Sequence, residues 1–110
     1  MVSLNEIAEG CLQVSQMRQK NGSRIDEDVL KHCAGEVAEA IIAREKLKRV
    51  NKETHPHAYE LMKGRYAEEI MDICICSLVA SAELEIDVET ALKKKFAVNE
   101  KRALGLGDKL

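Results

Sequence analysis

The stretch EEIMDICICSLVASA at residues 68–82 decides the fold, because it is the most apolar part of this 110-residue chain. Between Ile70 and Ala82 it carries a single charged residue, Asp72. A helix that is apolar on all sides must also be covered on all sides. Three further helices of one short chain barely supply that cover, so we expect oligomerisation to complete the fold, most simply as a homodimer.

The composition predicts a helical protein. Aromatic residues make up only 3% of the sequence, so the core must consist of aliphatic residues, Met and Cys. One proline and six glycines interrupt a chain rich in Ala, Leu, Glu, Lys and Met, which favour helices. The alternation typical of strands is not visible. We therefore expect an all-α fold, similar to a four-helix bundle, in a single domain over residues 1–110.

The first two helices are marked by capping residues. Ser3 and Glu6 form the S-x-x-E pattern of a capping box, and this helix should end near the Asn-Gly pair at residues 21–22. Asp26 is placed to cap a second helix that runs to about Val50. The basic end of this helix, KLKRV, suits the negative end of a helix dipole.

Residues 51–64 contain Asn, Pro and Gly and predict a loop with at most one helical turn. The third helix should then run from about Arg65 to about Leu84. Asp87 is placed to cap a fourth helix that ends near Arg102. The two histidines of the HPH sequence in the loop are expected to be solvated, since no Cys or carboxylate lies at metal-ligand spacing from them.

Charge and hydropathy exclude several kinds of partner. The net charge of −2 gives no bulk attraction to nucleic-acid polymers or anionic membranes. The longest uncharged run, residues 73–82, has ten residues and is too short to span a bilayer. The N-terminus lacks the apolar segment of a signal peptide, and the four cysteines are compatible with reduced thiols. We expect a cytoplasmic protein with no nucleic-acid or membrane partner.

Two pairs of carboxylates lie in the apolar helices: Glu36 with Glu39, and Glu69 with Asp72. Residues three apart share a helix face, and no lysine or arginine follows any of them by four residues. An unpaired carboxylate in apolar surroundings costs several kcal/mol. Such acids can be protonated, paired with cations of another helix, left on a solvated face, or bound to a metal ion. Oxygen ligands without His or Cys suit Mg²⁺, or Mn²⁺.

A third pattern lies in the predicted fourth helix. Lys95, Asn99 and Arg102 follow one another at spacings of four and three residues, so they share one face. Cations and an amide aligned in this way can bind phosphate oxygens. The alternative is a basic, solvated end of a helix that is favourable to the helix dipole.

Together these patterns resemble the MazG-like nucleotide pyrophosphohydrolases, of the all-α nucleoside triphosphate pyrophosphatase superfamily. The E-x-x-E motif of that family matches residues 36–39, and its E-x-x-D motif matches residues 69–72. A K-x-x-x-N-x-x-R pattern in its last helix matches residues 95–102. The resemblance covers about residues 25–103, and it implies a MazG-like four-helix fold that assembles as a homodimer or homotetramer.

The resemblance also implies a reaction, in which a (d)NTP and water give a (d)NMP and pyrophosphate, and a role in cleaning the nucleotide pool. The four carboxylates would hold Mg²⁺, with Mn²⁺ as an alternative, and Glu39 could instead act as the base that orients water. The basic face of the last helix would bind the phosphates. A different interpretation is a non-catalytic, oligomeric interaction module of the same fold. It is favoured by Gly35, where the family often has a further Glu, and by the lack of aromatic residues in the first helix.

Overall fold

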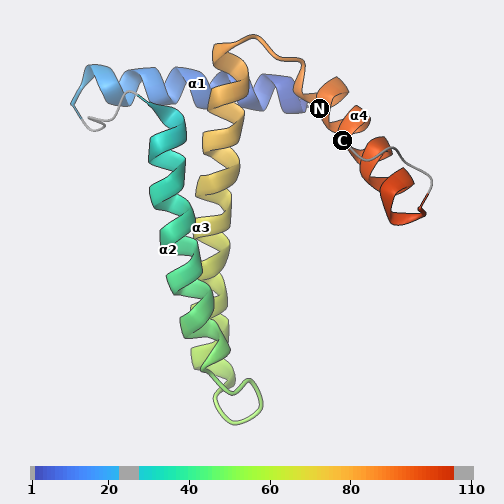
Figure 1. Ribbon diagram of the computed structural model, residues 1–110. Helices are drawn as coiled ribbons and strands as arrows, with labels where there is room; N and C mark the ends of the chain where they lie inside the picture. Colours follow the sequence, from blue (N-terminus) through green and yellow to red (C-terminus); the bar gives the residue numbers. More distant parts are fainter. Residues whose placement is uncertain (1, 23–27, 106–110) are drawn as a thin grey trace.

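The computed structural model describes residues 2–22 and 28–105, and these residues form helices and connecting turns without any strand (Figure 1). The all-α prediction is therefore confirmed. Four helices follow one another along the chain: α1 (Leu4–Lys20), α2 (Val29–Lys48), α3 (Pro56–Glu83) and α4 (Val88–Ala103). Helices α2 and α3 form a long antiparallel hairpin, α1 crosses its open end, and α4 projects away from it beside the start of α1 (Figure 1).

The predicted start of α1 is confirmed. The backbone N–H of Glu6 donates to the Ser3 hydroxyl at 3.1 Å, and the Glu6 carboxylate accepts from the backbone N–H of Ser3 at 3.5 Å. This capping box satisfies two of the backbone donors that every helix start leaves free. The helix ends at Lys20, Asn21 is its C-cap, and Gly22 follows with a φ of 79°.

The predicted start of α2 was wrong by two residues. Asp28 caps the helix, and Asp26 lies outside the described residues. The Asp28 backbone is extended, and its carboxylate accepts from the N–H groups of Leu30 at 3.0 Å and Lys31 at 3.4 Å. At its other end α2 stops at Lys48, just before the predicted Val50.

The loop predicted at 51–64 was also wrong, because α3 begins at Pro56 rather than near Arg65. Proline fits the first helical position, where its missing N–H would have no partner in any case. Gly64 lies inside the helix, and nothing lies within 4 Å of the position that a Cβ would take there. The connection shrinks to residues 49–55, in which the Asn51 side chain accepts two backbone N–H groups at 2.9 and 3.1 Å.

The end of α3 is closed by a residue in the left-handed conformation. Glu85 has a φ of 54°, and its N–H donates to the carbonyl of Ala82 at 3.1 Å. The N–H of Ile86 donates to the carbonyl of Ser81 at 3.0 Å. These two bonds satisfy carbonyls that the last turn of a helix leaves free, in an arrangement that usually has glycine in place of Glu85.

The start of α4 is held against α1. Asp87 caps the helix as predicted, because its carboxylate accepts from the Thr90 N–H at 3.2 Å. The Asn5 side chain of α1 donates to Asp87 at 3.0 Å and accepts from the Val88 N–H at 2.8 Å. Hydrogen bonds from Asn5 and Thr90 lower the pKa of Asp87, since they stabilise its charged form. From Thr90 to Gly105 every residue is exposed.

One chain has a small core and an open shape. The buried cluster consists of Ala8, Leu78, Ala82 and Val88, where α1 meets α3 and the first turn of α4. The radius of gyration is 17.4 Å, against about 13 Å for a compact chain of this length. The accessible surface is 8631 Å², against about 6,100 Å² for a compact monomer of this mass. Helices α2 and α3 pack side by side as bundle helices do, whereas α4 does not join them within one chain.

None of the four described helices combines the length and the apolar character that are required to cross a lipid bilayer.

Candidate metal centre

The antiparallel packing of α2 on α3 brings the two carboxylate pairs to one level of the hairpin. Glu36, Glu69 and Asp72 each offer an oxygen, and these oxygens all lie within 4.8 Å of one another. Two ligand oxygens of one Mg²⁺ ion lie at most about 4 Å apart, so small side-chain rotations suffice for these three to share an ion. Glu39 lies close enough to raise the pKa values of both Glu36 and Glu69 through its charge. All four acids of the two motifs therefore meet.

Two of the carboxylate oxygens in this acidic cluster have no hydrogen-bond partner. Oε2 of Glu36 and Oε2 of Glu69 are buried, and neither accepts a bond from any described group. A buried polar atom without a partner is rare in folded proteins and costs free energy. Carboxylate oxygens arranged in this way are the donor set that a hard divalent cation prefers, so the residues fit Mg²⁺ or Mn²⁺.

Electrostatics in the acidic cluster disfavour four negative charges. Burial raises the pKa of Glu36, and the charges of Glu39 and Asp72 raise it further. Burial also raises the pKa of Glu69, and the nearby charge of Glu39 adds to the effect. A bound cation would reverse this balance, because it favours the ionised form of each ligand.

His32 belongs to the site, although the sequence analysis did not assign it a role. Its Nε2 lies 3.2 Å from Oε1 of Glu36, one turn further along α2. Glu36 thus has a basic partner on its own helix, a histidine four residues before it, whereas the sequence analysis considered only lysine or arginine four residues after it. The four-residue spacing of His32 and Glu36 is the feature of the sequence that could have indicated this contact. A histidine pairs with a carboxylate as a cation only when it is protonated, so the spacing alone does not predict an ion pair. The charge of His32 acts to lower the pKa of Glu36, but burial and the neighbouring acids have the larger effect, so the pKa is raised overall.

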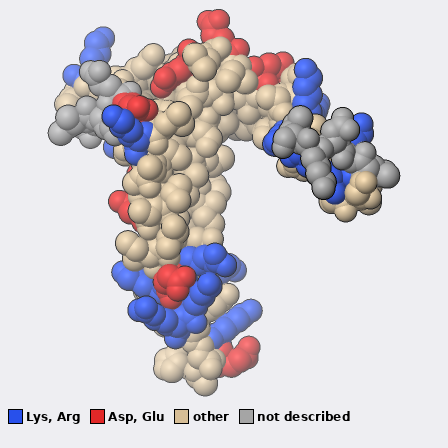
Figure 2. Space-filling view, in the orientation of Figure 1, with Lys and Arg blue, Asp and Glu red and all other residues tan. Residues whose placement is uncertain are grey.

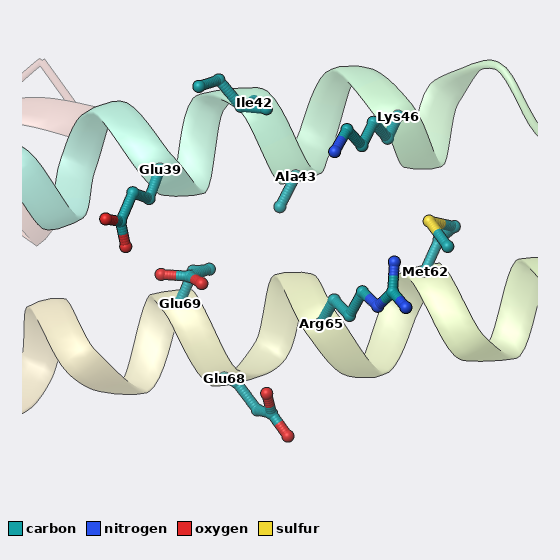
Figure 3. A pocket seen from close by; sticks show the side chains of 8 residues that line it. All are labelled: Glu39, Ile42, Ala43, Lys46, Met62, Arg65, Glu68 and Glu69. Atoms are coloured by element: carbon teal, nitrogen blue, oxygen red, sulfur yellow. The ribbon is translucent and has the colours of Figure 1, made fainter.

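Two hollows flank the acidic cluster along the hairpin. The first, of about 310 Å³, opens toward α1 and is bordered by Arg18, His32, Glu36 and Asp72 together with apolar side chains. The second, of about 220 Å³, lies between α2 and α3 on the side of the hairpin turn. Figure 3 shows this second hollow, with Glu39 and Glu69 at one end and Lys46 and Arg65 toward the other. The acidic cluster can therefore be reached from solvent on two sides.

The predicted phosphate-binding residues of α4 are not near the acidic cluster in the same chain. Lys95, Asn99 and Arg102 lie on the exposed part of α4, which projects away from the hairpin (Figure 1). Lys95 borders a hollow with Cys74 and Ser77 of α3. These two residues lie on a different face of α3 from Asp72, because they follow it by two and five residues.

The histidines of the hairpin turn are separate from the acidic cluster. His55 is exposed and precedes Pro56, and its Nδ1 lies 2.8 Å from the hydroxyl of Thr54. His57 is exposed within the first turn of α3. Among the described residues, neither histidine joins the group of carboxylates that could hold a metal ion.

Comparison with known proteins adds no relative. No protein-family model matches the chain, no curated protein is detectably similar to it, and no solved structure matches it. The resemblance to the MazG-like family thus rests on the order and spacing of the acidic and basic residues in this sequence.

Proposed function

We propose that this protein is a Mg²⁺-dependent nucleoside triphosphate pyrophosphohydrolase of the MazG-like kind, which converts a (d)NTP and water to a (d)NMP and pyrophosphate. The observation that carries the proposal is the meeting of carboxylates from two helices: Glu36, Glu69 and Asp72 offer oxygens within 4.8 Å of one another, and Oε2 of Glu36 and Oε2 of Glu69 are buried without a partner. A solvated acidic face would place its oxygens in water. Removal of nucleotides that should not enter nucleic acids is the cellular role that fits this reaction.

In the proposed mechanism, Glu36, Glu69 and Asp72 hold the cation, with Glu39 beside them. When bound, Mg²⁺ neutralises phosphate charge and lowers the pKa of a water molecule. Glu39 is the exposed glutamate of the acidic cluster and faces the hollow in Figure 3, so it is placed to accept a proton from the attacking water. Water attacks the α-phosphorus, its oxygen becomes part of the nucleoside monophosphate, and the bond from the α-phosphorus to the α–β bridging oxygen breaks, so that pyrophosphate leaves with that oxygen. His32 positions Glu36.

We also propose that the working form is a homo-oligomer, a dimer or a dimer of dimers. One chain has about 2,500 Å² more accessible surface than a compact monomer of its mass. An obligate interface can bury an area of this order on each subunit. Large apolar side chains are part of this surface, including Phe96 and Leu92 on α4 and Ile41 on α2. Phosphate contacts from Lys95, Asn99 and Arg102 would then require α4 to lie against the carboxylates of a second copy.

The test is release of pyrophosphate from each of the eight common ribo- and deoxyribonucleoside triphosphates, with and without Mg²⁺. We expect Mg²⁺-dependent release from the wild type and none from Glu69→Gln. The matched control is Glu60→Gln, an exposed glutamate on the same helix and outside the acidic cluster, which should retain full activity. Absence of release from all eight substrates would contradict the proposal.

Thermal unfolding distinguishes the enzyme from a non-catalytic interaction module. Any ligand of the native state stabilises it, so Mg²⁺ should raise the melting temperature of the wild type but not that of Glu69→Gln. A melting temperature that does not respond to Mg²⁺ or Mn²⁺, together with absent turnover, would favour the interaction module.

A further inference from the structure

We propose that Lys46 and Arg65 bind the phosphates that leave as pyrophosphate, so that the triphosphate tail of the substrate runs between α2 and α3 toward the hairpin turn. The proposal rests on the proposed function and adds a substrate-binding pair that the sequence motifs do not contain. It gives one chain its own phosphate-binding cations next to the acidic cluster, independently of α4.

The spacing of residues on the two helices places these cations beside the acids. Lys46 follows Glu39 by seven residues on α2, and Arg65 precedes Glu69 by four residues on α3, so each pair shares a face. At 1.5 Å per residue the two cations lie about 10 Å and about 6 Å along their helices from the acids. All four residues border the same hollow of about 220 Å³, whose remaining wall includes Ile42, Ala43 and Met62.

The two basic side chains lean toward each other. Side chains of a helix tilt toward its N-terminus, and α2 and α3 run in opposite directions. Lys46 therefore leans away from the hairpin turn and Arg65 toward it, and Figure 3 shows both charged groups in the space between the two helices. An ammonium and a guanidinium that converge in this way repel each other unless an anion lies between them.

Neither cation is neutralised by a neighbouring acid. Among the described residues the salt bridges are His32–Glu36 at 3.2 Å and Lys48–Glu45 at 3.6 Å, so Lys46 and Arg65 have no carboxylate oxygen within 4.0 Å. Three glutamates border the same hollow without pairing with either cation: Glu39, Glu68 and Glu69. The acids and the cations thus line one hollow without pairing. A ligand that contacts both a metal ion at the acids and the basic side chains requires this separation.

The surrounding charge favours a strongly anionic ligand. Residues 44–65 contain seven Lys and Arg against three Glu, in a chain whose net charge is −2. Figure 2 shows the basic side chains gathered over the part of the hairpin near its turn. Polyphosphate is the anion that matches both ends of the hollow, because its oxygens bind Mg²⁺ and also accept from arginine in a bidentate manner.

The test compares two double variants of equal charge and composition. Lys46→Gln with Arg65→Gln removes the proposed pair, whereas Arg44→Gln with Lys63→Gln removes one Arg and one Lys from the same part of the hairpin but outside the hollow. Calorimetry measures the Kd of inorganic pyrophosphate in the presence of Mg²⁺, and steady-state assays measure KM for the preferred triphosphate. Circular dichroism verifies that both variants fold, and Arg65→Lys, which keeps the charge but loses the planar fork, serves as a milder third variant.

We expect the first double variant to weaken pyrophosphate binding by more than about tenfold and to raise KM, since each charge-assisted hydrogen bond is worth about a factor of ten. The matched double variant should stay within about twofold of the wild type, because distant exposed charges are screened. Arg65→Lys should fall between the two.

Equal pyrophosphate affinities in the two double variants would overturn the assignment of Lys46 and Arg65. If the wild type still released pyrophosphate in a Mg²⁺-dependent manner, the proposed function would stand without it. A wild type that neither binds pyrophosphate with Mg²⁺ nor hydrolyses any triphosphate would overturn both.

Discussion

The α2–α3 hairpin and α4 both carry residues whose spacing indicates phosphate chemistry, yet the two regions are supported in different ways. In the hairpin, two antiparallel helices pack on each other and hold the carboxylates of Glu36, Glu69 and Asp72 together, with Glu39 beside them. Helix α4 is attached by its first turn to α1, and every residue from Thr90 to Gly105 is exposed. The hairpin therefore brings its acids together within one chain, whereas the proposed phosphate contacts of α4 would require a second copy.

The largest expected effect breaks the hairpin site alone. Asp72→Asn removes one ligand charge and keeps the shape of the side chain. It should reduce pyrophosphate release by more than about a hundredfold, because a metal ligand matters at least as much as the groups that orient it. Metal-free stability should be equal or higher, since repulsion among the acids falls. If Asp72→Asn unfolds the protein instead, Asp72 has a structural role.

The second effect concerns α4. Phe96 is 67% exposed in one chain and lies one turn after the exposed Leu92. Phe96→Asp should convert the oligomer to monomers and lower the melting temperature, because burying a carboxylate in an apolar interface costs several kcal/mol. Light scattering after gel filtration gives the mass. Lys94→Asp, on another face of α4, is the control and should leave the mass unchanged. A wild type that is monomeric at all concentrations would contradict the oligomer.

The third effect is a pH dependence that should have opposite directions in the hairpin and at the start of α4. The pKa values of Glu36 and Glu69 are raised above 4.5 in the folded protein, so the native state binds protons before the unfolded state does. The free energy of unfolding of the metal-free protein should therefore increase as the pH falls from neutrality toward about 4.5. At neutral pH, Mg²⁺ should increase it as well, because the ion binds the ionised carboxylates of the native state. Asp87 acts in the opposite direction and only below its ordinary pKa of 3.8, because its pKa is lowered in the folded state. Urea unfolding at several pH values measures both effects.

The smallest expected effect lies within the hairpin. His32→Gln removes the 3.2 Å contact with Glu36, a partly exposed pair that should contribute less than about 1 kcal/mol to stability. Urea unfolding of the wild type and of His32→Gln at neutral pH measures the loss. A variant as stable as the wild type would show that the contact does not stabilise the fold.

The contrast between the α2–α3 hairpin and α4 also explains which features could be predicted from the sequence. Helix periodicity is local and fixed, so spacing alone predicts that each pair of carboxylates shares a helix face. The antiparallel packing of α2 on α3 then brings the two pairs together. The placement of α4 depends on contacts between distant segments, such as the bond from Leu4 to Glu89 at 2.9 Å, and no spacing rule specifies these.

Two boundaries were misplaced for a reason that is also physical. Pro56 and Gly64 are typical of turns, but proline is accepted at the first position of a helix, and a glycine costs a long helix only about 1 kcal/mol. The packing of α3 on α2 outweighs that cost. Helix α3 consequently extends nine residues further toward its N-terminus than the sequence predicts, and Arg65 lies inside the hairpin instead of at a helix start.

Glu85, the residue with a left-handed backbone conformation after α3, influences the direction in which α4 leaves the hairpin. A side chain in that conformation costs about 1–2 kcal/mol, and Glu85 bears this cost at the single bend from which α4 departs. Glycine at position 85 would remove the penalty but would also widen the range of directions open to the following helix. The direction in which α4 departs thus depends on the backbone torsion of Glu85 as well as on the bonds from Leu4 and Asn5 that hold its first turn.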